Sequence, residues 1–136
     1  MELFTNAQKS LLLANGHPDN RDRDHAPVVK LVLPGTGCIW LLSEIDPDDP
    51  DIAFGLCDLG LGFPELGSVS VSELQSLCFW EGMPVMRDEQ FAAQFPMSVF
   101  VDAAWGEQAI TDDQFALQHA AARIQSRRSR NAPRPQ

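Results

Sequence analysis

Three carboxylates have the residue types and placement that could do chemistry: Glu44, Asp58 and Glu65. Glu44 and Asp58 each alternate with an aromatic residue, Trp40 and Phe54 respectively, on two consecutive predicted strands. If these strands pair, both acids line one pocket with Glu65 from the following loop. Such a pocket suits a hard cation or a proton transfer. Sequence does not fix the register between strands, so the alternative is that these acids cap turns and face water.

Arg87 is the next candidate, because it is the first cation after Lys30 and nine carboxylates lie between the two. We interpret Arg87 as an internal ion-pair partner, with an anion-holding role as the alternative. Together with Trp40, the three acids and Arg87 form the candidate interaction or ligand surface. The residues proposed for it are Trp40, Glu44, Asp58, Glu65 and Arg87.

Other reactive residues form no recognisable catalytic or metal-binding pattern. The three histidines and three cysteines lack zinc-ligand spacing, which leaves only a Cys–His pair assembled by the fold. Gly60-Leu61-Gly62 is followed by Pro64 and Glu65 rather than by a helix, so it is not a dinucleotide fingerprint. We predict no catalytic residue, no metal and no cofactor.

The elements that must position these residues follow from hydrophobic alternation and turn signals. Several strands in succession, joined by short turns, favour an α+β fold. We expect a small antiparallel meander of about four to five strands, with short helices packed at its ends and on one face. On the second strand, Glu44 should share a face with Trp40 and Leu42, opposite Ile39, Leu41 and Ile45. The predicted strands are Val28–Leu33, Cys38–Ile45, Ile52–Leu59, Gly67–Val71 and Met83–Met86.

Helix signals flank this sheet on both sides in the sequence. Capping-box spacings predict helices that begin at Thr5, Ser70 and Thr111. The first should end in a left-handed residue at Asn15-Gly16, and the last should be stapled by Ile110 against Phe115. A further helical turn should begin near Pro96 and stop at Gly106. Between the first helix and the first strand, residues 17–27 are expected to form a solvated loop.

The charge of the chain is divided unevenly. The 136 residues carry a net charge of −9, but residues 1–125 hold all 19 acidic side chains and only six of the ten basic ones, a net −13. We predict one domain over residues 1–125 and a disordered basic tail over 126–136. The acidic body should repel duplex DNA. Without a signal-peptide pattern or a membrane span, a cytoplasmic protein is expected.

The run WLLSEIDPDDPDIAFGLCDLGLGFPELGSVSVSEL, from Trp40 to Leu74, resembles the hallmark of domain-of-unknown-function family 2958. The resemblance extends from about Leu11 to Ala104, through PVVKLVLP and MPVMRDEQF. It implies a small bacterial α+β domain, often carried by plasmids and integrative elements, with no established enzymatic activity. Where the family has His two residues after Arg-Asp, this chain has Gln90, which cannot take over a role of that His.

Two functions are expected from these observations. The first is a non-enzymatic accessory protein of a mobile genetic element that acts through protein–protein contact. Its −13 body would engage basic surfaces of DNA-handling proteins, and anti-restriction mimicry of DNA charge is one form of this. The alternative is a small-molecule or divalent-metal-binding enzyme that uses the carboxylate cluster.

Overall fold

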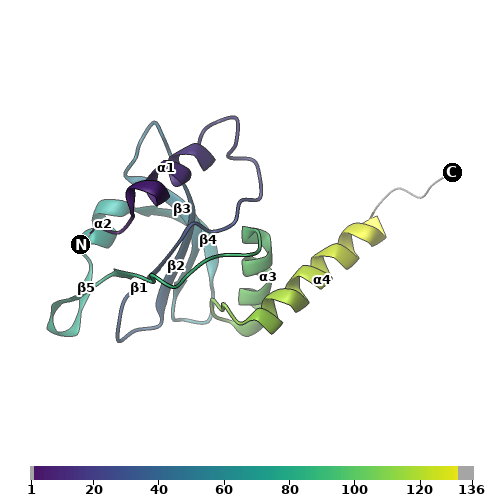
Figure 1. Cartoon of the computed structure of the whole chain (residues 1–136). Helices are drawn as coiled ribbons and strands as arrows, with labels where there is room; N and C mark the ends of the chain where they lie inside the picture. Colours follow the sequence, from purple (N-terminus) through teal and green to yellow (C-terminus); the bar gives the residue numbers. More distant parts are fainter. Residues whose placement is uncertain (1, 132–136) are drawn as a thin grey trace.

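The computed structural model describes residues 2–131, apart from the side chain of Trp80. It contains a five-stranded antiparallel sheet in the order β4-β3-β2-β1-β7 and a separate β5–β6 hairpin (Figure 1). The predicted α+β class is confirmed. The strands are β1 (Val29–Val32), β2 (Cys38–Ile45), β3 (Ile52–Leu59), β4 (Glu65–Ser70), β5 (Cys78–Phe79), β6 (Met83–Pro84) and β7 (Met86–Arg87). The helices are α1 (Asn6–Asn15), α2 (Val71–Ser76), the 3₁₀ turn η1 (Trp80–Gly82), α3 (Met97–Glu107) and α4 (Gln114–Asn131).

Helices cover both faces of the sheet, where we expected one face to be covered. Leu12 of α1 packs on one face in a core with Leu31, Leu42 and Ala53. On the other face, α3 and α4 pack over Leu41 and Leu56 in a second core. The sheet is therefore the middle layer of the molecule, with α1 on one side and α3 and α4 on the other (Figure 1). No helix among residues 2–131 combines the length and apolar character needed to cross a membrane.

A β-bulge in β2 changes which side chains share a face. β2 and β3 have the predicted bounds and pair antiparallel, but the register shifts between Leu42, opposite Gly55, and Glu44, opposite Phe54. The extra residue reverses the alternation, so Ile45 joins Leu42 in the α1-side core. The predicted face of Glu44 is therefore wrong: its side chain lies on the α3 side with Phe54.

The first helix begins as predicted but ends for a different reason. Thr5 and Gln8 form both hydrogen bonds of the capping box. Gly16 is not left-handed, because its φ is −81°. Glycine is needed there for space: a Cβ atom would lie 1.9 Å from the carbonyl oxygen of Ile45. Residue 16 must therefore be glycine because the end of α1 lies close to β2.

The connection between α3 and α4 also departs from the sequence prediction. α3 continues past Gly106 to Glu107, and its C-cap residue Gln108 has a φ of 60°. α4 begins at Gln114 rather than at Thr111, because the Asp113 carboxylate accepts the Ala116 N–H at 2.9 Å. The expected staple is not formed, since Phe115 is 75% exposed.

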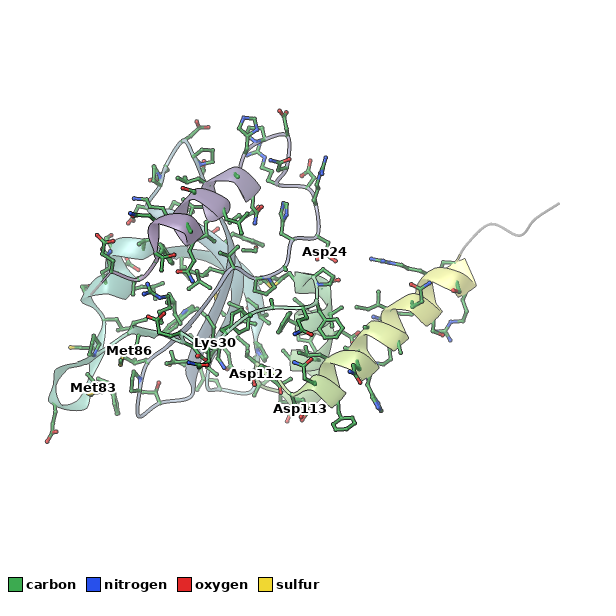
Figure 2. The ribbon with its side chains drawn as sticks, in the orientation of Figure 1. Asp24, Lys30, Met83, Met86, Asp112 and Asp113 are labelled. Carbon is green, nitrogen blue, oxygen red and sulfur yellow. The ribbon has the colours of Figure 1, made fainter. Side chains whose placement is uncertain are left out.

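Lys30 of β1 attaches this connection to the sheet. Its Nζ atom lies 2.8 Å from Asp112 Oδ2 and 3.6 Å from Asp88 Oδ2. Lys30 and Asp112 lie next to each other where α4 approaches the sheet (Figure 2). Since the Lys30 side chain is only 14% exposed, these ion pairs are partly shielded from water.

The sequence predicted a disordered basic tail over residues 126–136. Residues 126–131 continue α4, with Arg128 and Arg130 in its last turn. Cations at a helix C-terminus interact favourably with the helix dipole, which supports this extension. Residues 132–136, the rest of the predicted tail, lie outside the described residues.

Candidate functional site

The three predicted site carboxylates do not meet. Glu44 and Asp58 face the same side of the sheet, but Glu44 lies opposite Phe54, four residues along β3 from Asp58. At the rise of an extended strand this separation is about 13 Å. Glu65 is opposite Cys57, which packs against the core on the other face. Nowhere in the part of the chain that the structure describes do three or more His, Cys, Asp or Glu residues form a metal-binding group. The three-carboxylate hypothesis is wrong.

Asp58 has a structural role. Its side chain is buried, and each carboxylate oxygen accepts one backbone N–H, from Gly60 at 2.8 Å and from Ile110 at 2.9 Å. These bonds join the β3–β4 loop to the α3–α4 connection across 52 residues of sequence. Each carboxylate oxygen is thus engaged by the backbone, and we assign Asp58 to holding these two segments together.

Trp40 and Arg87 also belong to the framework. Trp40 is buried in the α1-side core. Arg87 forms an ion pair, because its Nη2 atom lies 2.8 Å from Glu89 Oε1, but this partner is 62% exposed and is not among the nine carboxylates that precede Arg87. Its Nη1 atom donates to the backbone oxygen of Glu2 at 3.1 Å, which holds the N-terminal segment against β7.

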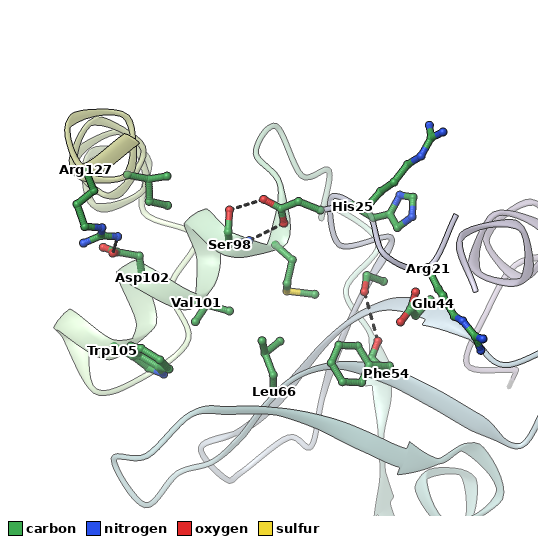
Figure 3. A pocket seen from close by; sticks show the side chains of 15 residues that line it. Arg21, His25, Glu44, Phe54, Leu66, Ser98, Val101, Asp102, Trp105 and Arg127 are labelled. Atoms are coloured by element: carbon green, nitrogen blue, oxygen red, sulfur yellow. Dashed lines mark hydrogen bonds and ion pairs between the residues drawn. The ribbon is translucent and has the colours of Figure 1, made fainter. Parts of the chain in front are cut away.

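Glu44 lines a pocket between the layers of the molecule. A cavity of about 420 Å³ lies between the sheet, α3, α4 and the loop of residues 17–27 (Figure 3). We call it the α3 groove. Its apolar lining residues are Phe54, Leu66, Met97, Val101, Trp105 and Ile124, and its polar ones are Arg21, Arg23, Asp24, His25, Ser43, Glu44, Ser98, Asp102 and Arg127.

The loop of residues 17–27 is held over the α3 groove by the start of α3. The Asp24 carboxylate accepts the Ser98 backbone N–H at 3.0 Å and also the Ser98 hydroxyl. The backbone oxygen of His25 accepts the Met97 N–H at 2.8 Å. These bonds satisfy amides that the first turn of a helix leaves unpaired. The loop predicted as solvated is thus anchored at its C-terminal end.

The end of the groove near the loop holds a carboxylate with no partner. Burial raises the pKa of Glu44 above its ordinary value, although the charges of His25 and Arg21 act in the opposite direction. No hydrogen bond or ion pair within 4 Å reaches this carboxylate from residues 2–131. His25 Nε2 lies 2.7 Å from the backbone oxygen of Asn20. A carbonyl only accepts, so this nitrogen carries a proton.

At the other end of the groove, Asp102 is held by two arginines. Its Oδ1 atom lies 2.6 Å from Arg123 Nη2, and its Oδ2 atom lies 2.6 Å from Arg127 Nη2. Burial acts to raise the pKa of Asp102, but hydrogen bonds from Arg127 and Arg123 outweigh it and lower the pKa. These contacts fasten α4 to α3.

A second surface feature adjoins the groove at Trp105. The Trp105 indole donates to the Pro64 backbone oxygen at 3.1 Å, while 67% of the residue remains exposed. Trp105 lines one hollow of about 310 Å³ with Phe63, and another of about 700 Å³ with Phe115. Phe63 and Phe115 are 76% and 75% exposed. We call Phe63, Trp105 and Phe115 the aromatic surface.

The residues that form the groove and the aromatic surface carry few local sequence signals. The bulge at Ser43, which turns Glu44 into the groove, is not marked by a glycine or proline next to it in β2. The signal lies on β3, where Gly55 is opposite Leu42 and a Cβ atom would lie 1.9 Å from the backbone oxygen of Leu41. Asp24 and Ser98 are 74 residues apart, so no short motif links them. Exposure of Phe63 follows from its place in a Gly-rich loop, which was a further usable signal.

These features define a small α+β protein with an antiparallel sheet between two helical layers, an amphipathic groove and an exposed aromatic surface. The chain belongs to the family described as "Protein of unknown function (DUF2958)", whose family model matches residues 3–111. The match confirms the resemblance and extends it on both sides. No curated protein and no solved structure matches the chain.

Proposed function

We propose that this protein acts without catalysis, through protein–protein contact at the aromatic surface. The observation that carries the proposal is the exposure of Phe63, Trp105 and Phe115, which come from three separate segments. Aromatic side chains supply much of the binding energy when an interface buries them. Clustered exposure of such residues is costly for a protein that has no partner.

The acidic residues around the aromatic surface indicate the kind of partner that would bind there. Glu65 lines the same hollow as Phe63, while Glu107 and Asp113 line the hollow that contains Phe115. A partner with an apolar pocket and a basic rim would complement this arrangement. DNA-handling proteins present basic surfaces, and the −13 of residues 1–125 would steer the chain toward them. The proposal therefore includes an accessory role in a bacterial mobile genetic element, which the family resemblance supports.

Site-specific photocrosslinking tests the proposal. A photoreactive phenylalanine would replace Phe63 or Phe115 in separate full-length variants, expressed in the source cells. The control position is Leu11, which is 51% exposed on α1, on the other side of the sheet. We expect positions 63 and 115 to capture the same protein and position 11 not to capture it.

Charge variants and salt then identify the mode of contact. The double substitution Glu65→Gln and Glu107→Gln, or a rise in salt from about 50 to 300 mM, should reduce capture several-fold, because exposed charges become screened. Capture that is equal at all three positions, or insensitive to both changes, would contradict the proposal. Crosslinking of the chain to itself would identify a homo-oligomer instead and would also count against it.

A further inference from the structure

We propose that the α3 groove binds a free α-amino acid with a large apolar side chain. Its ammonium group would lie at Glu44, its carboxylate at Arg21, and its side chain along Phe54, Leu66 and Val101. The site is separate from the protein contact proposed above, although Trp105 borders both.

The charged groups at one end of the groove match a zwitterion. Glu44 and Arg21 lie side by side at this end, with Phe54 beneath them (Figure 3), and they also line a smaller hollow together. No ion pair within 4 Å joins the two side chains. The carboxylate accepts hydrogen bonds, as an ammonium requires. The guanidinium presents a planar fork of donors that fits a carboxylate.

The other acids that line the groove are already engaged. Asp24 accepts two hydrogen bonds from Ser98, and Asp102 is paired with Arg123 and Arg127. Glu44 is thus the one lining carboxylate without a recorded partner among residues 2–131. A simple anion would be repelled by the Glu44 carboxylate. A simple amine would be repelled by the Arg21 guanidinium. A zwitterion satisfies both groups.

The rest of the groove is shaped for an apolar side chain. Leu66 and Val101 lie between Phe54 at the charged end and Trp105 at the other end (Figure 3). Leu66 is 47% exposed, so a ligand here would remove apolar surface from water. The volume of about 420 Å³ falls among small-molecule sites, which span roughly 300–1,000 Å³.

Calorimetric titration of the whole chain with four probes tests this assignment. L-Phenylalanine carries both charges, 3-phenylpropionate lacks the ammonium, and 2-phenylethylamine lacks the carboxylate. We expect L-phenylalanine to bind about tenfold or more tightly than either truncated probe, because each loses one charge-assisted interaction. Glycine, which lacks the apolar side chain, should bind weakest.

Variants locate the site. Glu44→Gln should weaken L-phenylalanine about tenfold and leave 3-phenylpropionate unchanged or tighter. The control Glu73→Gln removes an acid on α2 outside the groove and should change neither affinity. Amide NMR shifts on adding L-phenylalanine should concentrate at Glu44, Phe54, Leu66 and Val101, which tests the site without relying on a variant.

Three results would overturn the inference. The first is that L-phenylalanine does not bind at concentrations up to about 10 mM, which would mean an affinity too weak for a specific site. The second is equal affinity for L-phenylalanine and 3-phenylpropionate. The third is binding that Glu73→Gln weakens as much as Glu44→Gln. None of these results bears on crosslinking at the aromatic surface, so the two proposals fail independently.

Discussion

Replacing Asp58 should destabilise the protein severely, although its acid was a candidate ligand in the sequence. The carboxylate is 2% exposed and accepts the N–H groups of Gly60 and Ile110. Asp58→Ala removes both acceptors, which leaves the Ile110 amide without one in a buried position and the Gly60 amide without one in an exposed loop. Hydrogen bonds to a charged group contribute about 1.5–3 kcal/mol each, and the exposed Gly60 amide can bond to water instead, so the loss should lie near the lower end of their sum, about 3–4 kcal/mol. This is a large fraction of the roughly 5–15 kcal/mol that stabilises most domains.

Asp58→Asn provides a graded comparison. One amide oxygen still accepts an N–H, but the NH₂ group then faces the second donor. The loss should be intermediate, about 1–3 kcal/mol. Asp48→Asn, in the exposed β2–β3 turn, is the matched control and should cost less than about 0.5 kcal/mol.

Urea unfolding followed by circular dichroism measures these differences. With a slope of about 1.5–2 kcal/mol per molar urea, Asp58→Ala should lower the midpoint by about 2 M. A midpoint within about 0.3 M of the parent would refute the assignment of Asp58 as a buried structural acceptor. Amide exchange should also accelerate at Gly60 and Ile110, because their N–H groups lose their acceptors.

Three further predictions concern space, charge and reactivity. Gly16→Ala should destabilise by more than about 2 kcal/mol in urea unfolding, because its Cβ would meet a backbone oxygen at 1.9 Å. Gly106→Ala, with open space in α3, should instead stabilise by about 0.5–1 kcal/mol. Asp102→Asn should cost about 1 kcal/mol at pH 7, and the cost should disappear in acid. Iodoacetamide at pH 8 should modify exposed Cys78 before Cys57, whose pKa is raised by burial, as peptide mass mapping would show.

The pH dependence of the Asp102 prediction has a definite sign. The pKa of Asp102 is lowered in the folded protein, so ionised Asp102 stabilises the fold above its unfolded value of about 4. This stabilisation is lost as the pH falls through the lower folded value. A difference in stability between parent and variant that persists at pH 2 would contradict the ion-pair explanation.

The other two predictions have their own contrary outcomes. Equal losses of stability from Gly16→Ala and Gly106→Ala would argue against the steric explanation. Faster alkylation of Cys57 than of Cys78 would contradict the burial of Cys57.

The sequence by itself determined the class of fold and much of the local structure. The bounds of β2 and β3, and the capping box at Thr5, were predictable because alternation and capping depend on residues a few positions apart. The scarcity of cations indicated that Arg87 would pair with an acid, but not that the partner would be the exposed Glu89 two residues later. Interactions between residues a few positions apart do not depend on how the rest of the chain folds.

Tertiary structure alone decided the candidate sites. A single extra residue at Ser43 placed Glu44 in the groove. Its sequence signal, Gly55, lies on the neighbouring strand, and only the pairing of β2 with β3 shows which residues it affects. Asp58 found its second N–H donor 52 residues away, and Asp24 found Ser98 at a distance of 74 residues. Such contacts depend on how whole layers pack against each other, because register and helix placement minimise exposed apolar surface over the entire chain. The three acids that the sequence suggested as one site therefore lie apart. Asp58 joins two loops, Glu44 lines the α3 groove, and Glu65 is exposed at the start of β4.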